Sequence, residues 1–240
     1  MQSAVSCLHL MFRSIIQKIF SLFGFRLMRL RPAIVSDPAH LWDTNARFQE
    51  FYRGVQARTV VDKTRCFIIY QALLQTSGLE GDAAEVGVYR GGTAALIGRT
   101  LRGTKKTVYI FDTFTGMPRT DVRRDLHRTG DFGDTALRDV RQFLQNDANV
   151  VITPGVFPES GAAIAGKTFS FVHLDVDIYR SVRGALGFFY PRLARGGILV
   201  CDDYGFLNCP GAREAVDEFF AAKAERPIYL PTGQSLILKL

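Results

Sequence analysis

The stretch that decides the fold is His173-Leu174-Asp175-Val176-Asp177, together with Cys201-Asp202-Asp203-Tyr204 one helix's length further along the chain. Each stretch closes an apolar, β-branched run, which predicts a buried strand that ends in carboxylates. Residues 180–194 between them are predicted to be helical, and Gly196-Gly197 breaks that helix before the second strand. A strand–helix–strand unit makes the two strands parallel, so their carboxyl ends meet at the edge where α/β sheets bind ligands.

Four carboxylates are expected to converge at that edge: Asp175, Asp177, Asp202 and Asp203. Like charges at this density need a counter-cation, and a set of oxygen ligands favours Mg²⁺ over zinc. Asp202 and Asp203 would point to opposite faces of a continuing strand, so both face one ion only if the chain leaves the sheet there. The following Tyr204-Gly205 permits this exit. The alternative is that these residues cap helices or open turns.

A second informative segment, residues 82–96, predicts a short strand that runs into Glu85 and Gly87, after which Gly91-Gly92 opens a helix. Glycines at such a turn let a ligand approach the backbone and the helix N–H groups. A dinucleotide fingerprint would need glycine where Tyr89 stands, which disfavours pyrophosphate binding. The pattern resembles instead the first motif of S-adenosylmethionine methyltransferases, although glycine-rich turns occur in many α/β proteins.

Another apolar strand, residues 108–112, ends in Asp112, which follows Glu85 by 27 residues. An acid at the tip of the second strand can accept hydrogen bonds from both hydroxyls of a cofactor ribose. The alternative is that Asp112 only begins the next loop.

Taken together, the chain resembles the macrocin O-methyltransferase family, Mg²⁺-dependent enzymes that methylate sugar hydroxyls with S-adenosyl-L-methionine. The matching pieces lie within residues 60–240, and they are the stretches at 85–92, 111–118, 174–179, 190–193, 196–204 and 210–219. The resemblance implies that Asp175, Asp202 and Asp203 bind the metal and that Asp177 is the general base. Val176 departs from the glycine of many relatives. The implied cofactor-binding residues are Glu85, Gly87, Tyr89, Gly91, Gly92 and Asp112.

The length of 240 residues, 47% of them hydrophobic, suits one α/β core with an N-terminal appendage. We therefore predict an appendage over residues 1–45 and a methyltransferase domain over residues 46–240. Further strands are predicted at 150–153, 228–230 and 236–239, and the Pro231-Thr232-Gly233 turn makes the last two an antiparallel hairpin. The expected fold is a Rossmann-like class I methyltransferase with a seven-stranded, mostly parallel sheet.

The first 31 residues carry five lysines and arginines and no acidic residue, and their apolar positions recur at helical spacing. Charges interrupt every long apolar run, which disfavours a membrane-spanning helix and a signal peptide. Two hypotheses remain: a basic amphipathic helix at a membrane surface, or a helix packed on its own domain or across a homo-oligomer. Basic patches with interleaved aromatic residues do not occur in the core, so nucleic acid is not expected as a partner.

The cysteines, at positions 7, 66, 201 and 209, have no C-x-x-C spacing, so they predict no zinc site and favour a cytoplasmic location. The membrane-surface hypothesis for residues 1–31 would place the protein peripherally at the inner membrane surface. His173 shares a strand face with Asp175 and either touches the site or is structural. Residues 113–133 form a long charged segment that predicts a lid or a solvated loop.

The sequence thus predicts a Mg²⁺-assisted O-methyltransferase whose acceptor is a small molecule with a hydroxyl group, most simply a sugar. Two rival functions stay open at this point. One is a catechol-type O-methyltransferase with the same fold and metal. The other is a protein that binds the cofactor or a membrane without turnover.

Overall fold

The computed structural model of the protein describes residue 16 and residues 40–240, and residues 41–240 form one compact unit. The amphipathic helix predicted within residues 1–31 lies outside the described residues except for Ile16. Within the part of the chain that the structure describes, no helix is both long enough and apolar enough to cross a bilayer.

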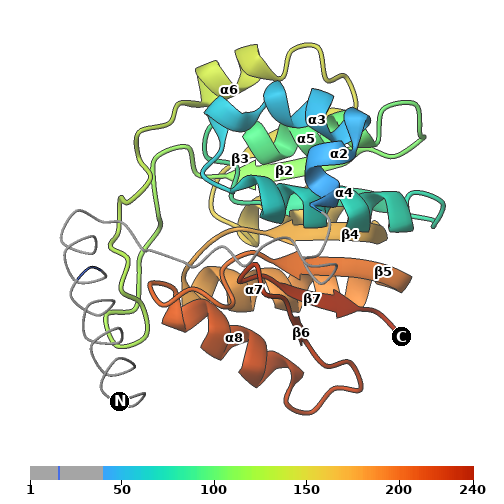
Figure 1. Ribbon diagram of the computed structural model, residues 1–240. Helices are drawn as coiled ribbons and strands as arrows, with labels where there is room; N and C mark the ends of the chain where they lie inside the picture. Colours follow the sequence, from blue (N-terminus) through green and yellow to red (C-terminus); the bar gives the residue numbers. More distant parts are fainter. Residues whose placement is uncertain (1–15, 17–39) are drawn as a thin grey trace, which may run out of the picture. The chain divides into compact units, whose positions relative to one another are not determined.

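The centre of the unit is a seven-stranded sheet with the strand order β3-β2-β1-β4-β5-β7-β6 (Figure 1). The first five strands in this order are parallel, whereas β7 is antiparallel to both β5 and β6. The predicted seven-stranded sheet and its C-terminal antiparallel hairpin are therefore confirmed. The strands are β1 (Asp82–Val86), β2 (Val108–Asp112), β3 (Val150–Pro154), β4 (Phe169–Leu174), β5 (Leu193–Cys201), β6 (Ile228–Tyr229) and β7 (Ser235–Leu238).

Helices cover both faces of the sheet, and each face has its own apolar cluster (Figure 1). One cluster joins the sheet to α3, α4 and α5, and the other joins it to α7 and α8. The α-helices of the unit are α2 (Leu41–Thr44), α3 (Ala46–Arg53), α4 (Lys63–Thr76), α5 (Gly92–Thr100), α6 (Leu137–Phe143), α7 (Tyr179–Phe189) and α8 (Pro210–Phe220).

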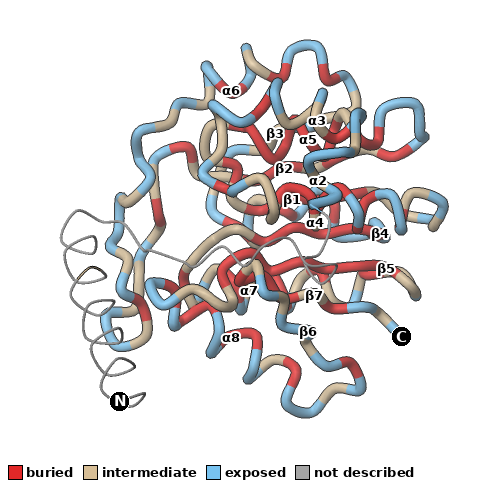
Figure 2. Tube along the Cα trace, viewed as in Figure 1, coloured by how far each residue is buried: buried red, intermediate tan, exposed pale blue. Residues whose placement is uncertain are grey.

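Strand β4 lies in the middle of the sheet, and all six of its residues are buried (Figure 2). Its side chains alternate between the two clusters: Phe171 packs in the cluster with α4, and Val172 and Leu174 pack in the cluster with α7. This two-sided burial explains why β4 is a nearly continuous apolar run, as is usual for central parallel strands. By the same alternation, His173 lies on the α4 face of the sheet.

The connection from α7 to β5 differs from the sequence prediction. Helix α7 ends at Phe189, a 3₁₀ turn over Tyr190–Arg192 follows, and β5 already begins at Leu193. The Gly196-Gly197 pair therefore lies inside β5, where the pairing with β4 changes register. Gly196 has a φ of +77°, a left-handed conformation that glycine adopts without strain, so the pair marks an irregularity of the strand rather than a loop.

The end of β1 and the end of β4 approach each other closely at Gly87. This residue has a φ of +87°, and a Cβ atom placed on it would overlap the backbone carbonyl of Asp175. The Asp175 backbone N–H donates to the carbonyl of Val86 at 2.9 Å, which fixes the two segments together. Glycine at position 87 therefore sets how near the first acidic residue lies to the glycine-rich turn.

We expect Gly87→Ala to destabilise the protein more than Gly103→Ala. Gly103 has a φ of +88° but no atom within 4 Å of its would-be Cβ, so its substitution costs about 1–2 kcal/mol of backbone strain alone. At Gly87 the same strain is joined by overpacking against fixed backbone, which adds about 1–3 kcal/mol or more. Urea unfolding of both variants measures the difference, and equal losses of unfolding free energy would contradict the close approach.

Candidate functional site

Three carboxylates meet at the carboxyl edge of the sheet, as the parallel strands require. Asp175 follows β4, and Asp202 and Asp203 follow β5. One oxygen from each of the three lies within 4.8 Å of the others. Asp202 lies on the same face of β5 as the residues that pack under α4. The chain has left the sheet by Asp203, so the strict alternation of faces no longer applies and both carboxylates can approach Asp175. Asp202 and Asp203 are 0% and 3% exposed.

A buried network of charges holds Asp202 in place. Its carboxylate pairs with Arg65 of α4, accepts a hydrogen bond from Gln234 Nε2 at 2.7 Å, and lies 3.4 Å from His173 Nε2. The other ring nitrogen of His173, Nδ1, lies 2.9 Å from Glu85 Oε1. Glu85, His173 and Asp202 are each 0% exposed, so this network links β1, β4 and β5 inside the protein.

The charge state of His173 follows from these partners. Burial alone would lower its pKa, but hydrogen bonds to Asp202 and Glu85 outweigh burial and raise the pKa to about 10. The ring is thus an imidazolium at neutral pH, with both nitrogens donating. Both ring nitrogens face buried carboxylates and His173 does not line the cavity, so its contacts are those of a structural residue.

The remaining acids carry more negative charge than the nearby cations balance. Burial and the neighbouring Asp202 raise the pKa of Asp175 well above its usual value, and burial and Asp177 do the same for Asp203. The pKa of Asp202 is instead lowered, because hydrogen bonding to His173 and the charges of His173 and Arg65 outweigh its burial. Oxygen ligands at these separations, in a place where the nearby cations balance only part of the negative charge, fit a hard divalent cation such as Mg²⁺.

Asp177 lies two residues after Asp175, between β4 and α7, in a strained backbone conformation. It has a φ of +56°, which is uncommon for a residue with a side chain. Its backbone N–H and that of Val176 both donate to Asp203 Oδ2, at 2.8 and 3.0 Å. This clamp ties the position of Asp177 to that of Asp203. Burial, the largest influence, raises the pKa of the Asp177 carboxyl although nearby His127 lowers it.

One cavity of about 320 Å³ connects the acidic edge to the glycine-rich turn. Its wall includes Gly87, Tyr89 and Asp112 from the predicted cofactor side, and Asp175, Asp177 and Asp203 from the acidic side. The structure therefore brings residues from both sequence predictions into one space. Apolar side chains complete the wall, among them Phe111, Met117, Phe132, Phe157 and Phe206.

Asp112 organises the turns on the cofactor side. Its Oδ2 accepts hydrogen bonds from the backbone N–H groups of Val88 and Tyr89 at 2.7 and 2.9 Å, and its Oδ1 accepts one from Phe114 at 2.7 Å. Oδ1 keeps one lone pair, because a carboxylate oxygen can accept two hydrogen bonds. Asp112 thus joins the turn after β1 to the turn after β2, and it still has acceptor capacity toward the cavity.

Three of the predicted cofactor residues do not line the cavity. Glu85 points to the α4 face, where it meets His173. Gly91, with a φ of +87°, is the N-cap residue of α5 and lies near Val140 and Phe143. Gly92 lies so close to the backbone of Arg58 that a Cβ would not fit. These two glycines allow the turn to pack closely against neighbouring segments. Glu85 contacts His173 in the buried network and does not contact the cavity.

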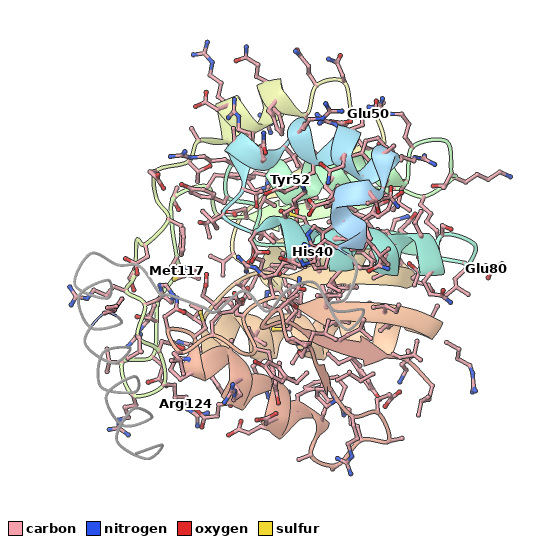
Figure 3. The ribbon with its side chains drawn as sticks, viewed as in Figure 1. His40, Glu50, Tyr52, Glu80, Met117 and Arg124 are labelled. Carbon is pink, nitrogen blue, oxygen red and sulfur yellow. The ribbon has the colours of Figure 1, made fainter. Side chains whose placement is uncertain are left out.

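The long segment over residues 113–133 is an ordered wall of the cavity rather than a solvated loop. Backbone hydrogen bonds between Met117 and Asp131 and between Gly130 and Met117 fold it back on itself. Asp125 accepts a hydrogen bond from the N–H of Tyr179 at the start of α7, and Arg124 pairs with glutamates of α8 (Figure 3). Arg124 is therefore paired with carboxylates of the protein, and it does not line the cavity where a substrate would bind.

Sequence reasoning missed three polar residues of the site: Arg65, His127 and Cys209. Arg65 and Cys209 line the cavity, and His127 Nε2 lies 3.7 Å from Asp177 Oδ1. No local pattern marks them, because each acquires its partner across a large separation in sequence, such as 137 positions from Arg65 to Asp202. Charge balance predicts a cation near the four aspartates, but it does not predict that Arg65 of α4 supplies a positive charge there.

Comparison with known proteins agrees with the fold. A family model described as macrocin-O-methyltransferase (TylF) matches residues 24–230. Demethyldecarbamoylnovobiocin O-methyltransferase of Streptomyces niveus is 29% identical over 219 residues, covering 80% of this chain and 82% of the relative. A tetracenomycin-C rhamnosyl 4′-O-methyltransferase of Streptomyces olivaceus is 31% identical over 156 residues, or 59% of each chain.

Solved structures give the same answer. The O-methyltransferase NovP has a TM-score of 0.67 and 26% identity, covering 76% of this chain and 82% of its own. The calicheamicin methyltransferase CalS11, at 15% identity, shares the fold with a TM-score of 0.66 over 89% and 99% of the two chains. The family match over most of the chain and the confirmed class I fold lead to one conclusion: this chain belongs to the macrocin O-methyltransferase (TylF) family of S-adenosylmethionine-dependent O-methyltransferases.

Proposed function

We propose that the protein methylates a hydroxyl group on the sugar of a glycosylated natural product, with Mg²⁺ held by Asp175, Asp202 and Asp203. The observation that carries this proposal is the joint position of two sets of residues in one cavity. Asp175 and Asp203 line the same cavity as Gly87 and Asp112 of the cofactor side, and an oxygen of the buried Asp202 lies within 4.8 Å of an oxygen of each of these two aspartates.

The acceptor class is supported by what the relatives methylate. One acts on a rhamnosyl group of a tetracenomycin, and another is a mycinamicin III 3″-O-methyltransferase of Micromonospora griseorubida, 29% identical over 158 residues. The cavity suits a molecule of this kind, because its wall combines carboxylates with apolar Met117, Phe132 and Phe206. The carboxylates would face the hydroxyl groups, and the apolar side chains would face the aglycone.

The reaction needs a stronger nucleophile than a neutral hydroxyl. S-adenosylmethionine, when bound, supplies a sulfonium methyl group for in-line attack. Mg²⁺, when bound, stabilises the negative charge that develops on the acceptor oxygen. The protein's own contribution is to align the reactants and to remove the proton.

Asp177 is the residue that would remove the proton. Its carboxylate lines the cavity, and the clamp to Asp203 fixes it next to the proposed metal ligands. Burial raises its pKa, which makes it a better proton acceptor than an exposed aspartate. Asp177 is therefore assigned as the general base, and Asp175, Asp202 and Asp203 are assigned as the metal ligands.

Acceptor class is tested by incubating the protein with S-adenosylmethionine, Mg²⁺ and a panel of compounds. We expect methyl transfer to a sugar hydroxyl of glycosides that carry a deoxysugar, and none to catechols of similar size. Mass spectrometry of the products, with the aglycones alone as controls, locates the methyl group. Methylation of the catechols without methylation of any glycoside would replace the proposal by the catechol-type activity.

The metal assignment is tested with Asp175→Asn, because no described residue donates a hydrogen bond to the Asp175 carboxylate and the substitution leaves the Arg65–Asp202 pair in place. Loss of one charged ligand should raise the Mg²⁺ concentration needed for half-maximal turnover by about 10-fold or more. A chelator should stop turnover of the unmodified protein, and cofactor affinity from calorimetry should persist in both proteins. Full turnover after chelation would remove the metal from the reaction.

The base assignment is tested with Asp177→Asn at saturating Mg²⁺. The amide cannot accept the proton, so turnover should fall by about 10²–10⁴-fold, the usual contribution of a positioned base. Cofactor affinity should hold, because Gly87 and Tyr89 follow β1 and Asp112 ends β2, whereas Asp177 follows β4. Asp217→Asn, at an exposed position on α8, is the control for the loss of one charge. Turnover near that of the unmodified protein would exclude Asp177 as the base.

A further inference from the structure

Three different donor atoms surround a point beside the acidic edge. Cys209 Sγ lies 3.3 Å from Asp177 Oδ1, and His127 Nε2 lies 3.7 Å from each of these two atoms. The residues come from the loop before α8, the turn after β4 and the segment over residues 113–133. A nitrogen, an oxygen and a sulfur at such mutual distances form a group that can hold a metal ion.

The distances agree with the geometry of tetrahedral zinc. Zinc binds thiolate sulfur at about 2.3 Å and imidazole nitrogen and carboxylate oxygen at about 2.0–2.2 Å, so ligand atoms of a tetrahedron lie about 3.3–3.6 Å apart. The observed separation of 3.3 Å lies within this range, and the two separations of 3.7 Å exceed it slightly. Small side-chain movements would bring all three atoms to a common ion.

A further contact fixes the histidine ring in the orientation that a metal needs. His127 Nδ1 lies 3.2 Å from Asp131 Oδ2, and the side-chain nitrogen of Asn208 lies 3.2 Å from His127 Nε2. With the proton on Nδ1 donated to Asp131, the single lone pair of Nε2 accepts from Asn208, and a zinc ion bound to Nε2 would replace this hydrogen bond. A carboxylate behind a ligating histidine is the usual outer partner of a zinc site.

We propose that His127, Asp177 and Cys209 form a site for Zn²⁺, separate from the oxygen ligands proposed for Mg²⁺, and that zinc bound there inhibits methyl transfer. The inhibition rests on the proposed function, because zinc would occupy the carboxylate assigned as the base. The binding step releases the Cys209 proton to solvent, changes no oxidation state and leaves a fourth position for water.

The two sites differ in the ions that they select. Mg²⁺ prefers oxygen ligands and binds thiolate and imidazole poorly, whereas zinc favours nitrogen and sulfur. Without zinc, the Cys209 thiol donates to Asp177 Oδ1 at 3.3 Å. Zinc would replace this proton. The metal-free arrangement thus leaves Asp177 available, and the zinc-bound arrangement does not.

The binding test uses Co²⁺ as a spectroscopic probe in the presence of excess Mg²⁺, which fills the oxygen ligands. We expect visible bands typical of tetrahedral cobalt and a near-ultraviolet thiolate band, both lost when Zn²⁺ is added. Cys209→Ser should remove the thiolate band and weaken zinc binding by about 100-fold or more, since an outer-shell change alone costs about 10–100-fold. Cys66→Ser, which alters another buried thiol, is the matched control and should keep the spectrum.

Two further variants test the site independently, in case Cys209→Ser does not fold. His127→Gln changes a residue on the segment over 113–133, and Asp131→Asn changes only the outer partner of the ring. The first should abolish the cobalt spectrum, and the second should weaken zinc binding about 10-fold or more. Absence of cobalt and zinc binding in the unmodified protein, or a thiolate band that survives Cys209→Ser, would overturn the site.

The inhibition is measured separately, as turnover at saturating Mg²⁺ with increasing Zn²⁺. We expect inhibition at the zinc concentrations that displace cobalt, and reversal by a zinc-selective chelator. Zinc that binds through Cys209 without reducing turnover would confirm the site but overturn its inhibitory role, and with it the assignment of Asp177 as the base. Failure of zinc binding would leave that assignment unaffected, so the two conclusions fail independently.

Discussion

The structure depends on a chain of buried charges that runs from Glu85 through His173 to Asp202 and Arg65. It joins three neighbouring strands and the helix α4 through side chains that are almost entirely removed from water. A buried charge without its partner is strongly destabilising, because burial removes its hydration. The network therefore holds Asp202 in one orientation, and its two cations offset two of the carboxylates while Asp175, Asp177 and Asp203 stay unbalanced.

This unequal balance divides the site into parts with different chemistry. In the part that faces α4, the charges of Glu85, His173, Asp202 and Arg65 are paired with one another inside the protein. The part that faces the cavity is open, and its carboxylates have raised pKa values because they repel one another and are buried. A divalent cation would complete the balance. Next to it, Cys209 lines the cavity and lies 3.7 Å from His127 Nε2, so softer donor atoms adjoin the oxygen ligands.

The segment over residues 113–133 connects the two ends of the cavity. It begins beside Asp112 on the cofactor side, contributes Met117 to the wall, and carries His127 to Asp177 on the acidic side. Two of its residues attach it to helices: Asp125 accepts a hydrogen bond at the start of α7, and Arg124 forms an ion pair with α8. The charged residues that made this segment look like a solvated loop thus serve to attach it to the helices.

The sequence by itself determined the sheet, the edge that carries the site and the acids that lie there. Those features follow from alternation, from apolar runs that end in Asp112, Asp175 and Asp202, and from the rule that parallel strands share a carboxyl edge. Only the tertiary structure decided which acids are paired. Glu85 is directed away from the cavity by the pleat of β1, His173 becomes a cation between two acids, and His127 meets Asp177 and Cys209. The physical reason is that charge balance and metal geometry depend on distances of a few ångströms between residues far apart in the chain, which no local pattern encodes.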